Sequence, residues 1–274
     1  MQKRAKRLLE SFLAEDIGKG DITSKLLSKK KISANIVSRQ QGILAGVKYA
    51  EEIFVSRQCR VRILKSDGQK IKKNEKIMII SGQAYSILSC ERTVLNLLSR
   101  MSGIATQTNM LARMIKKTNP HVELYSTRKT APGLRFFDKE AVEVGGGNKH
   151  RMSLDQMIMI KDNHIAVVKS LRELIQLTKK HYKIIEVEVE NLNDAFTAAI
   201  EGATIIMLDN IPPSKIRKIV KVLEKLGLRK KVKLEASGGI NISNVKSYAK
   251  SGVDMISIGK LTSSVSGLDL SLEV

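Results

Sequence analysis

The first part of the chain alternates short helical and strand patterns. Apolar residues at helical spacing predict helices over 8–13, 45–55 and 87–115, and alternating apolar runs predict strands over 61–63 and 77–80. Within the longest of these helices, Gly103 is a candidate break. Elements that follow one another so closely predict a locally connected domain of mixed α and β structure.

After His121 the pattern changes to apolar strands that alternate with amphipathic helices. The expected strands cover 122–125, 157–160, 184–189, 204–208, 232–234 and 255–258, and the expected helices cover 165–180, 193–201, 213–226 and 241–251. This rhythm predicts parallel strands joined by crossover helices, in a barrel or in an open doubly wound sheet. The six strands are fewer than the eight of a complete barrel. A boundary near 105–120 separates the two architectures.

The composition is that of an ordinary globular protein. Of the 274 residues, 42% are hydrophobic and 27% are charged. The apolar runs are far shorter than the roughly 20 residues that span a bilayer, and the first residues contain no apolar signal-peptide core. The two cysteines, Cys59 and Cys90, are too few for a disulfide framework. We therefore expect a cytoplasmic protein with no membrane partner.

The charge of the chain is unusual. Lys and Arg outnumber Asp and Glu by 48 to 27, which gives a net charge of +21. Such an excess attracts polyanions, including nucleic acid, membrane surfaces and phosphorylated metabolites. Aromatic residues make up only 4% and no recognition motif is present, so we do not expect nucleic acid as the main partner. Nucleic-acid binding is the rival function, and its signature is a steep salt dependence of affinity.

Charged or small residues follow nearly every expected strand of the second part. They are the residues 126–129, 161–164, Glu190, Asp209, 237–239 and 259–260. In α/β barrels and open α/β sheets, active sites gather at the carboxyl ends of the parallel strands. We therefore expect these residues to form one functional rim.

The expected strand 184–189 carries carboxylates at alternating positions. Alternation places Glu186, Glu188 and Glu190 on one face, where a covered parallel sheet is normally apolar. Buried carboxylates are unfavourable unless cations, hydrogen bonds or a metal compensate them. The expected partners are Arg128, Lys129 and Lys161. The alternative is an edge strand with one wet face.

Oxygen ligands and phosphates favour a magnesium site at this rim. Glu190 and Asp209 are the outermost carboxylates and are the expected ligands of Mg²⁺, directly or through water. The four histidines have no metal-ligand spacing, so we expect no zinc site.

Small-residue loops supply candidate anion sites. The triple glycine 145–147 precedes Lys149, His150 and Arg151, which can present cations to a compact anion. The loops 237–241 and 260–262 follow the last two strands, where barrels commonly bind phosphate. A sugar phosphate activated by a magnesium-bound pyrophosphate, reacting with a carboxylated ring, would use all of these features.

Three motifs resemble the quinolinate phosphoribosyltransferases, also called nicotinate-nucleotide pyrophosphorylases (carboxylating). They are STRKTAPGLR at 126–135, GGGNKHR at 145–151 and IKDNHI at 160–165. The resemblance extends in order through 15–23, 91–96, 102–106, 186–191, 208–210 and 257–262. It implies an α/β fold with an N-terminal α/β sandwich domain (1–105) and an incomplete, six- to seven-stranded α/β barrel (106–263), with the tail 264–274 on the first domain. It also implies a homodimer, or a larger assembly of dimers, with shared active sites.

The reaction implied by the resemblance joins quinolinate to phosphoribosyl pyrophosphate. It yields nicotinate mononucleotide, pyrophosphate and CO₂ and uses Mg²⁺, which places the enzyme in NAD biosynthesis. The implied catalytic residues are Lys129, Lys161, Glu190 and Asp209. The implied substrate contacts are these four and Arg92, Thr127, Arg128, His150, Arg151, Ser237, Gly238, Gly239, Ile240, Asn241, Lys260, Leu261 and Thr262.

The resemblance also distributes roles among these residues. It assigns the two carboxylates of quinolinate to Arg128, Lys129, His150 and Arg151, completed by Arg92 from the neighbouring subunit. It assigns the ribose pyrophosphate to Lys129 and Lys161, and the ribose hydroxyls and Mg²⁺ to Glu190 and Asp209. It assigns the 5′-phosphate to the loops 239–241 and 260–262.

Two positions depart from the usual family pattern. Ser126 stands where the family usually has Asp, and Ser263 stands where it usually has His. A related group, the molybdenum-transport-associated phosphoribosyltransferase-like proteins, shares several motifs and is the alternative, with another ring substrate. The sequence Lys-Asp-Asn-His at 161–164 favours the quinolinate enzymes.

Overall fold

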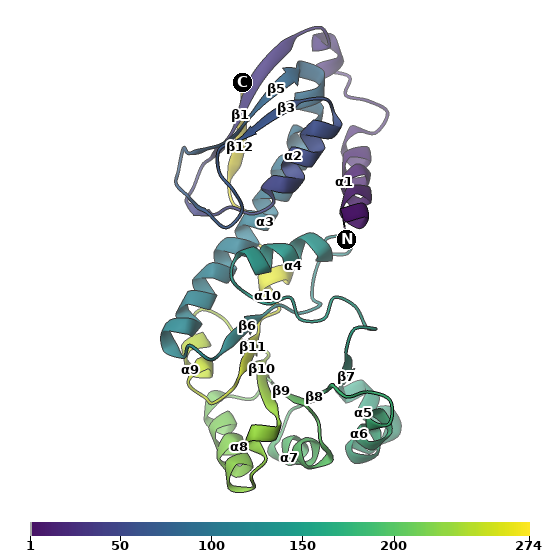
Figure 1. Ribbon diagram of the computed structural model, residues 1–274, viewed down its shortest axis with the longest axis vertical. Coiled ribbons are helices and arrows are strands. Elements are labelled where there is room, and N and C mark those ends of the chain that lie inside the picture. Colours follow the sequence, from purple (N-terminus) through teal and green to yellow (C-terminus); the bar gives the residue numbers. More distant parts are fainter. Residues whose placement is uncertain (1) are drawn as a thin grey trace. The chain divides into compact units, whose positions relative to one another are not determined.

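In the computed structural model, which describes residues 2–274, the chain divides into two units (Figure 1). The first unit contains the chain up to Asn109, the residues 131–146 and the tail from Ser264. The second unit contains Met110–Thr130 and Gly147–Ser263. The first division falls within the expected boundary region 105–120, whereas residues 131–146, which the sequence placed in the second domain, belong to the first unit.

The first unit is built around an antiparallel sheet in the order β12-β1-β5-β3. Its strands are β1 (Lys31–Ser38), β3 (Arg60–Ile63), β5 (Lys76–Gln83) and β12 (Leu270–Glu273), beside the small pair β2 (Gly42–Ile43) and β4 (Lys70–Ile71). Its helices are α1 (Gln2–Ile17), α2 (Val47–Ser56), the first part of α3 (Ala84–Thr118) and α4 (Arg135–Val144). Figure 1 shows α2 alongside this sheet, where it contacts β3. α4 belongs to this unit although its sequence falls between two strands of the other.

The long helix α3 runs for 35 residues without a break. The expected interruption at Gly103 was therefore wrong. A Cβ at this position would lie 2.1 Å from the carbonyl oxygen of Ser266, so the absence of a side chain lets the C-terminal tail approach the helix. Gly103 is thus a packing residue rather than a helix breaker.

The second unit is built around six parallel strands in the order β6-β11-β10-β9-β8-β7. They are β6 (Glu123–Tyr125), β7 (Ile158–Ile160), β8 (Ile185–Val189), β9 (Ile205–Asp209), β10 (Lys233–Ser237) and β11 (Met255–Ser257). All six expected strands are present. Most carry fully buried apolar side chains, among them Ile206, Leu234 and Ile256, because helices cover the sheet.

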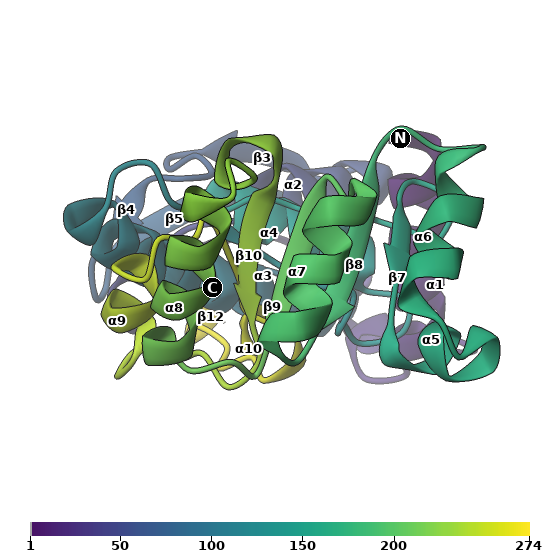
Figure 2. The same ribbon diagram turned by 90° about the horizontal axis from the view of Figure 1, so that it is seen from below.

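The helices of the second unit follow its strands, and all but the last of them connect successive strands. They are α5 (Asp162–Val168), α6 (Leu171–Lys179), α7 (Leu192–Glu201), α8 (Pro213–Lys225), α9 (Val245–Ala249) and α10 (Lys260–Ser263). Figure 2 shows α7 in front of β8 and β9, which it contacts. The expected helix 165–180 is two helices, because Lys169 adopts a left-handed conformation and the Ser170 hydroxyl caps α6.

Strands β6 and β7 form the two ends of this sheet, and a short segment continues it beyond β6. Tyr125 pairs in parallel with Asn148. The Asn148 amide donates to the Leu124 carbonyl at 2.8 Å, and the Ser126 amide donates to the Asn148 carbonyl at 2.9 Å. The architecture is therefore mixed α/β, with an incomplete parallel barrel of six strands. A seventh segment at Asn148, called the bridging segment below, pairs with β6.

Candidate active site

The carboxyl ends of the six parallel strands bring together most of the expected site residues. The register of β8 and β9 pairs Val189 with Leu208, and that of β9 and β10 pairs Asp209 with Ser237. Glu190 directly follows Val189, and Asp209 directly follows Leu208. The two carboxylates therefore lie side by side at the ends of neighbouring strands. The rim expected from the sequence is a real edge of the sheet.

The three carboxylates of β8 lie at increasing exposure along one face. Glu186 is fully buried, Glu188 is partly buried and Glu190 is exposed. Lys161 pairs with Glu188, as expected from the sequence. Glu186 instead faces His150, which was not among its expected partners. The face therefore leads from a closed interior to an open edge.

The position of Lys161 is fixed by the start of α5. Its backbone amide donates to Nδ1 of His164 at 3.0 Å, which satisfies an N–H group at the helix terminus. The Lys-Asp-Asn-His motif therefore begins the helix and directs the lysine side chain towards Glu188.

The loop after β6 is tied to two neighbouring segments. The buried Ser126 hydroxyl donates to the Lys149 carbonyl at 2.9 Å, and the Thr262 hydroxyl donates to the Lys129 carbonyl at 2.7 Å. An ionised aspartate at position 126 could not donate the first of these bonds. Serine at this position is therefore consistent with the observed loop geometry.

Two arginines meet beside this loop. Arg151 is 8% exposed, and its guanidinium donates to the Met157 carbonyl at 2.9 Å. Burial lowers the pKa of Arg151, and the positive charge of Arg128 lowers it further. The Nε atom of Arg128 is buried and has no hydrogen-bond partner in the described part of the chain. Adjacent guanidinium groups are suited to a planar carboxylate, because each presents several N–H donors in one plane.

His150 directly precedes Arg151, and its ring contacts the backbone amide of that arginine. Its Nε2 atom is 3.4 Å from a carboxylate oxygen of Glu186 and 3.4 Å from one of Glu235. Its Nδ1 atom accepts the backbone amide hydrogen of Arg151 at 2.8 Å. Burial alone would lower the pKa of His150, but the two carboxylates outweigh it and raise the pKa to about 9. The imidazole is directed to the interior, and both of its nitrogens face groups of the protein.

The two small-residue loops follow β10 and β11. Gly238 has φ +86°, and a Cβ there would lie 2.3 Å from the Asn210 side chain, so the turn requires glycine. Gly239 is exposed, whereas the side chains of Ile240 and Leu261 are buried. Towards a ligand, this part of the rim therefore offers backbone groups together with the exposed side chain of Lys260.

Family models match both parts of the chain. The model described as the quinolinate phosphoribosyl transferase N-terminal domain matches residues 21–102, and the C-terminal domain model matches residues 104–273. The chain belongs to the quinolinate phosphoribosyltransferase family.

Individual relatives cover nearly the whole chain. The protein is 42% identical to a probable nicotinate-nucleotide pyrophosphorylase (carboxylating) of Methanothermobacter thermautotrophicus, covering 97% of this chain and 98% of the relative. It is 40% identical to the protein of the same name in Bacillus subtilis, covering 98% and 93%. The solved nicotinate-nucleotide pyrophosphorylase of Francisella tularensis superposes with a TM-score of 0.92 at 38% identity, covering 100% and 96%.

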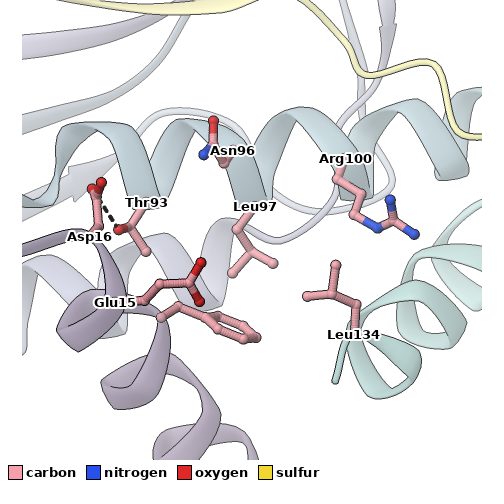
Figure 3. Close-up of a pocket in the computed structure, with 8 residues that line it drawn as sticks. Glu15, Asp16, Thr93, Asn96, Leu97, Arg100 and Leu134 are labelled. Atoms are coloured by element: carbon pink, nitrogen blue, oxygen red, sulfur yellow. Dashed lines mark hydrogen bonds between the residues drawn. The ribbon is translucent and has the colours of Figure 1, made fainter. Parts of the chain in front are cut away.

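Two further family-like motifs meet in a pocket of the first unit (Figure 3). The pocket has a volume of about 340 Å³ and is lined by Phe12, Glu15, Asp16, Thr93, Asn96, Leu97, Arg100 and Leu134. The Thr93 hydroxyl donates to Asp16 at 3.1 Å, which joins the motif 15–23 to the motif 91–96. Arg92 lies on α3 in this unit with an exposed side chain.

Sequence reasoning missed Glu235 and the carbonyl that anchors Arg151. Glu235 lies in the middle of an apolar strand, where it is buried. An acidic residue within such a strand is unusual, and this was the signal that could have identified Glu235 as a site residue. Its partner His150 is far away in sequence, so no local spacing relates the two.

Among residues 2–274, no helix combines the length and apolarity needed to cross a membrane.

Proposed function

We propose that the protein transfers the phosphoribosyl group of phosphoribosyl pyrophosphate to quinolinate with decarboxylation. The products are nicotinate mononucleotide, pyrophosphate and CO₂. The observation that carries this proposal is the pair of neighbouring arginines, Arg128 and Arg151, at the carboxyl edge of a parallel sheet. The family relationship supports the same reaction.

The arginines bind the dicarboxylate ring. The fork of each guanidinium matches a planar carboxylate, and the buried, unpartnered Nε of Arg128 is available to it. Lys129 adds a third cation, and its loop is held by the Thr262 hydroxyl. His150 contributes through Arg151, whose amide donates to its ring.

The phosphoribosyl substrate lies along the rest of the edge. Lys161, held by Glu188, and the exposed Lys129 contact the pyrophosphate. Thr127 belongs to the same loop. The backbone of the loops 237–241 and 260–262 receives the 5′-phosphate, because phosphate binds readily to backbone N–H groups at such loops.

Glu190 and Asp209 fit a magnesium ion in their donor chemistry. Both offer carboxylate oxygens, and the strand register makes them neighbours on an accessible edge. When bound there, Mg²⁺ neutralises charge on the departing pyrophosphate. The two carboxylates also face the ribose, where they hold its hydroxyls and stabilise positive charge at C1.

The reaction needs positioning and electrostatics from the chain. The bond between C1 of the ribose and the pyrophosphate oxygen breaks, and its electron pair leaves with the pyrophosphate. The ring nitrogen of quinolinate donates its electron pair to C1. The quaternised nitrogen then stabilises the electron pair left on the adjacent carbon as CO₂ departs, and that carbon takes up a proton.

A product assay tests this function. Purified protein with quinolinate, phosphoribosyl pyrophosphate and Mg²⁺ is expected to release nicotinate mononucleotide and CO₂ in equal amounts. Absence of product with quinolinate, combined with turnover of another ring, would move the assignment to the molybdenum-transport-associated relatives. Tight binding of duplex DNA at physiological salt without quinolinate turnover would favour the nucleic-acid alternative.

We also propose a homodimer in which Arg92 completes the site of the neighbouring subunit. The exposed position of Arg92 on α3 supports this, as does the family relationship. Two unpaired, buried cysteines support a reducing, cytoplasmic setting.

Mixing two inactive variants tests the shared site. Arg92→Ala and Lys161→Ala are each expected to be inactive. In a mixed dimer both lesions fall in one site and leave the other intact, so random exchange of subunits should restore about a quarter of the wild-type activity. Lack of recovery after exchange has been verified, for example by mass spectrometry, would contradict a shared site.

A further inference from the structure

The buried cluster of His150, Glu186 and Glu235 contains more acid than its single imidazole can pair with. The two glutamates come from β8 and β10, and neither has exposed surface. Their four carboxyl oxygens have no hydrogen-bond partner in the part of the chain that the structure describes. Two unpaired buried carboxylates at such a short distance from one nitrogen would repel each other strongly.

The number of protons in the cluster follows from its surroundings. The pKa of about 9 at His150 describes the three interacting groups together, because burial and the charge of Glu235 also raise the pKa of Glu186. The cluster therefore retains one proton more at neutral pH than a neutral imidazole and two ionised carboxylates would hold.

The geometry at Nδ1 decides where that proton lies. Nδ1 of His150 accepts the amide hydrogen of Arg151, and a ring nitrogen that accepts a hydrogen bond carries no hydrogen of its own. The imidazole is thus neutral, with its hydrogen on Nε2 facing both glutamates. The additional proton belongs to the carboxyl pair.

We propose that Glu186 and Glu235 share one proton and act through His150 as positioning residues for Arg151. The shared proton leaves one negative charge, which receives the Nε2 hydrogen and holds the imidazole. The imidazole in turn holds the backbone amide of Arg151, and His150 adopts the left-handed conformation (φ +54°), which is unfavourable for a residue with a side chain. The identity of the anion bound by Arg151 rests on the proposed function, whereas the structure of the cluster does not.

A metal ion is the competing occupant of the same three side chains. Their ligand atoms lie within 4.8 Å of one another. Metal binding through Nε2 would require the hydrogen to sit on Nδ1, where it would meet the Arg151 amide hydrogen. The observed contact therefore favours a proton over a metal.

The shared proton makes an unusual prediction for substitutions. Gln resembles a protonated Glu, so Glu186→Gln or Glu235→Gln alone preserves the charge of the cluster. Each single variant is expected to keep the KM for quinolinate within about threefold, whereas the double variant, which removes the last carboxylate, should raise it by about tenfold or more. The KM for phosphoribosyl pyrophosphate should stay within about twofold in all three. Glu201→Gln is the matched control, because Glu201 lies at the end of α7, before the amino end of β9.

The pH profile gives a second readout. The other titratable or charged groups around the cluster are Tyr125, whose ring packs edge-on to the imidazole, and Arg151, Arg128 and Glu188 near Arg151. Burial raises the pKa of Tyr125 above its ordinary value, so the phenol stays neutral. In the wild type, the KM for quinolinate should rise as the pH approaches 9 and the shared proton leaves. In either single Gln variant this rise should be absent.

Nitrogen NMR of histidine-labelled protein tests the cluster without any activity. The other histidines, His121, His164 and His181, are exposed, and substituting each in turn assigns its signal and leaves the fourth to His150. We expect a neutral ring with an unprotonated Nδ1 between pH 6 and 8, a range bounded by the ordinary titration of histidine at about 6.5. A doubly protonated ring would overturn the proposal, as would stoichiometric metal in the purified protein.

The kinetic outcomes are equally decisive. Single variants as impaired as the double variant would show that no proton is shared, and an unimpaired double variant would show that the cluster does not position Arg151. If the wild type does not turn over quinolinate, the proposed function fails, and the NMR result still decides the cluster. If the double variant does not fold, the single variants and the NMR experiment retain the test.

Discussion

Each unit of the molecule buries charged groups, and the two do so in opposite ways. In the first unit, Arg100 donates from Nε and Nη2 to the two oxygens of the buried Asp138, at 2.7 and 2.9 Å. In the second unit, one imidazole faces two carboxyl groups at 3.4 Å. The first arrangement matches one charge to one charge with formed hydrogen bonds, whereas the second leaves an acid in excess.

The difference separates a structural ion pair from a group that must hold a proton. A buried pair with two short, parallel hydrogen bonds has no need to change its protonation state. A buried pair of acids next to a single imidazole reaches a stable charge only by retaining a proton. The cluster of His150, Glu186 and Glu235 is also the one that contacts a candidate substrate-binding arginine, through the backbone amide of Arg151.

Removing one member of the Arg100–Asp138 ion pair should have the largest effect on stability. Arg100→Met leaves the Asp138 carboxylate buried without its partner, and we expect a loss of about 3–5 kcal/mol in the free energy of unfolding. Urea denaturation of the wild type and of the Arg100→Met variant measures this loss.

The control uses an exposed ion pair in the same chain. The Arg172 side chain is 69% exposed in its pair with Glu201, so Arg172→Met should cost no more than about 1 kcal/mol. Equal losses from the two substitutions would show that the burial of Asp138 does not matter.

The cluster of His150, Glu186 and Glu235 should make the stability of the protein depend on pH. The two carboxylates raise the pKa at which the cluster loses its additional proton from 6.5, the ordinary value of histidine, to about 9, so the stabilising effect of this proton is complete below about pH 6.5 and is lost as the pH rises towards 9. The raised pKa of Glu186 acts in the same direction. The full effect corresponds to about 3 kcal/mol.

Unfolding measured between pH 6.5 and 9 tests this dependence. Glu186→Gln carries no shared proton, so the difference in unfolding free energy between this variant and the wild type should change across the range. Taking the difference cancels the titration of other groups, including Cys90, whose burial raises its pKa to about 11. A difference that stays constant across this pH range would show that the cluster holds no additional proton.

Patterns within single elements could be predicted from the sequence, and pairings between distant elements could not. The strand at 204–208 and the helix at 213–226 are found almost as expected, because their apolar positions have a clear period. β12 was missed because it is a strand only through its pairing with β1 at the other end of the chain. α4 was missed because the charged residues Asp138 and Lys139 lie on its buried face.

The candidate site shows the same division. The rim was predictable, since the residues after successive parallel strands share an edge. The pairing of Lys161 with Glu188 followed from that edge. The contact between His150 and Glu235 was not predictable, because it depends on the bridging segment beside β6, which has no strand pattern of its own.

The smallest expected effect concerns the hydrogen bond that holds this bridging segment. The buried Ser126 hydroxyl donates to the Lys149 carbonyl, one residue before His150. Ser126→Ala should cost about 1 kcal/mol of unfolding free energy, the usual value of one such bond. Because the bond ties the segment that carries His150 and Arg151 to β6, the same substitution should also raise the KM for quinolinate by about two- to threefold.

The matched control lies in the first unit. Ser33 is exposed on β1, so Ser33→Ala should change stability by less than about 0.5 kcal/mol and leave the KM unaltered. A Ser126→Ala protein that loses stability with an unchanged KM would show that the bridging segment keeps Arg151 in place without this bond. That result would leave the imidazole of His150 as the main link between the buried carboxyl pair and the substrate-binding edge.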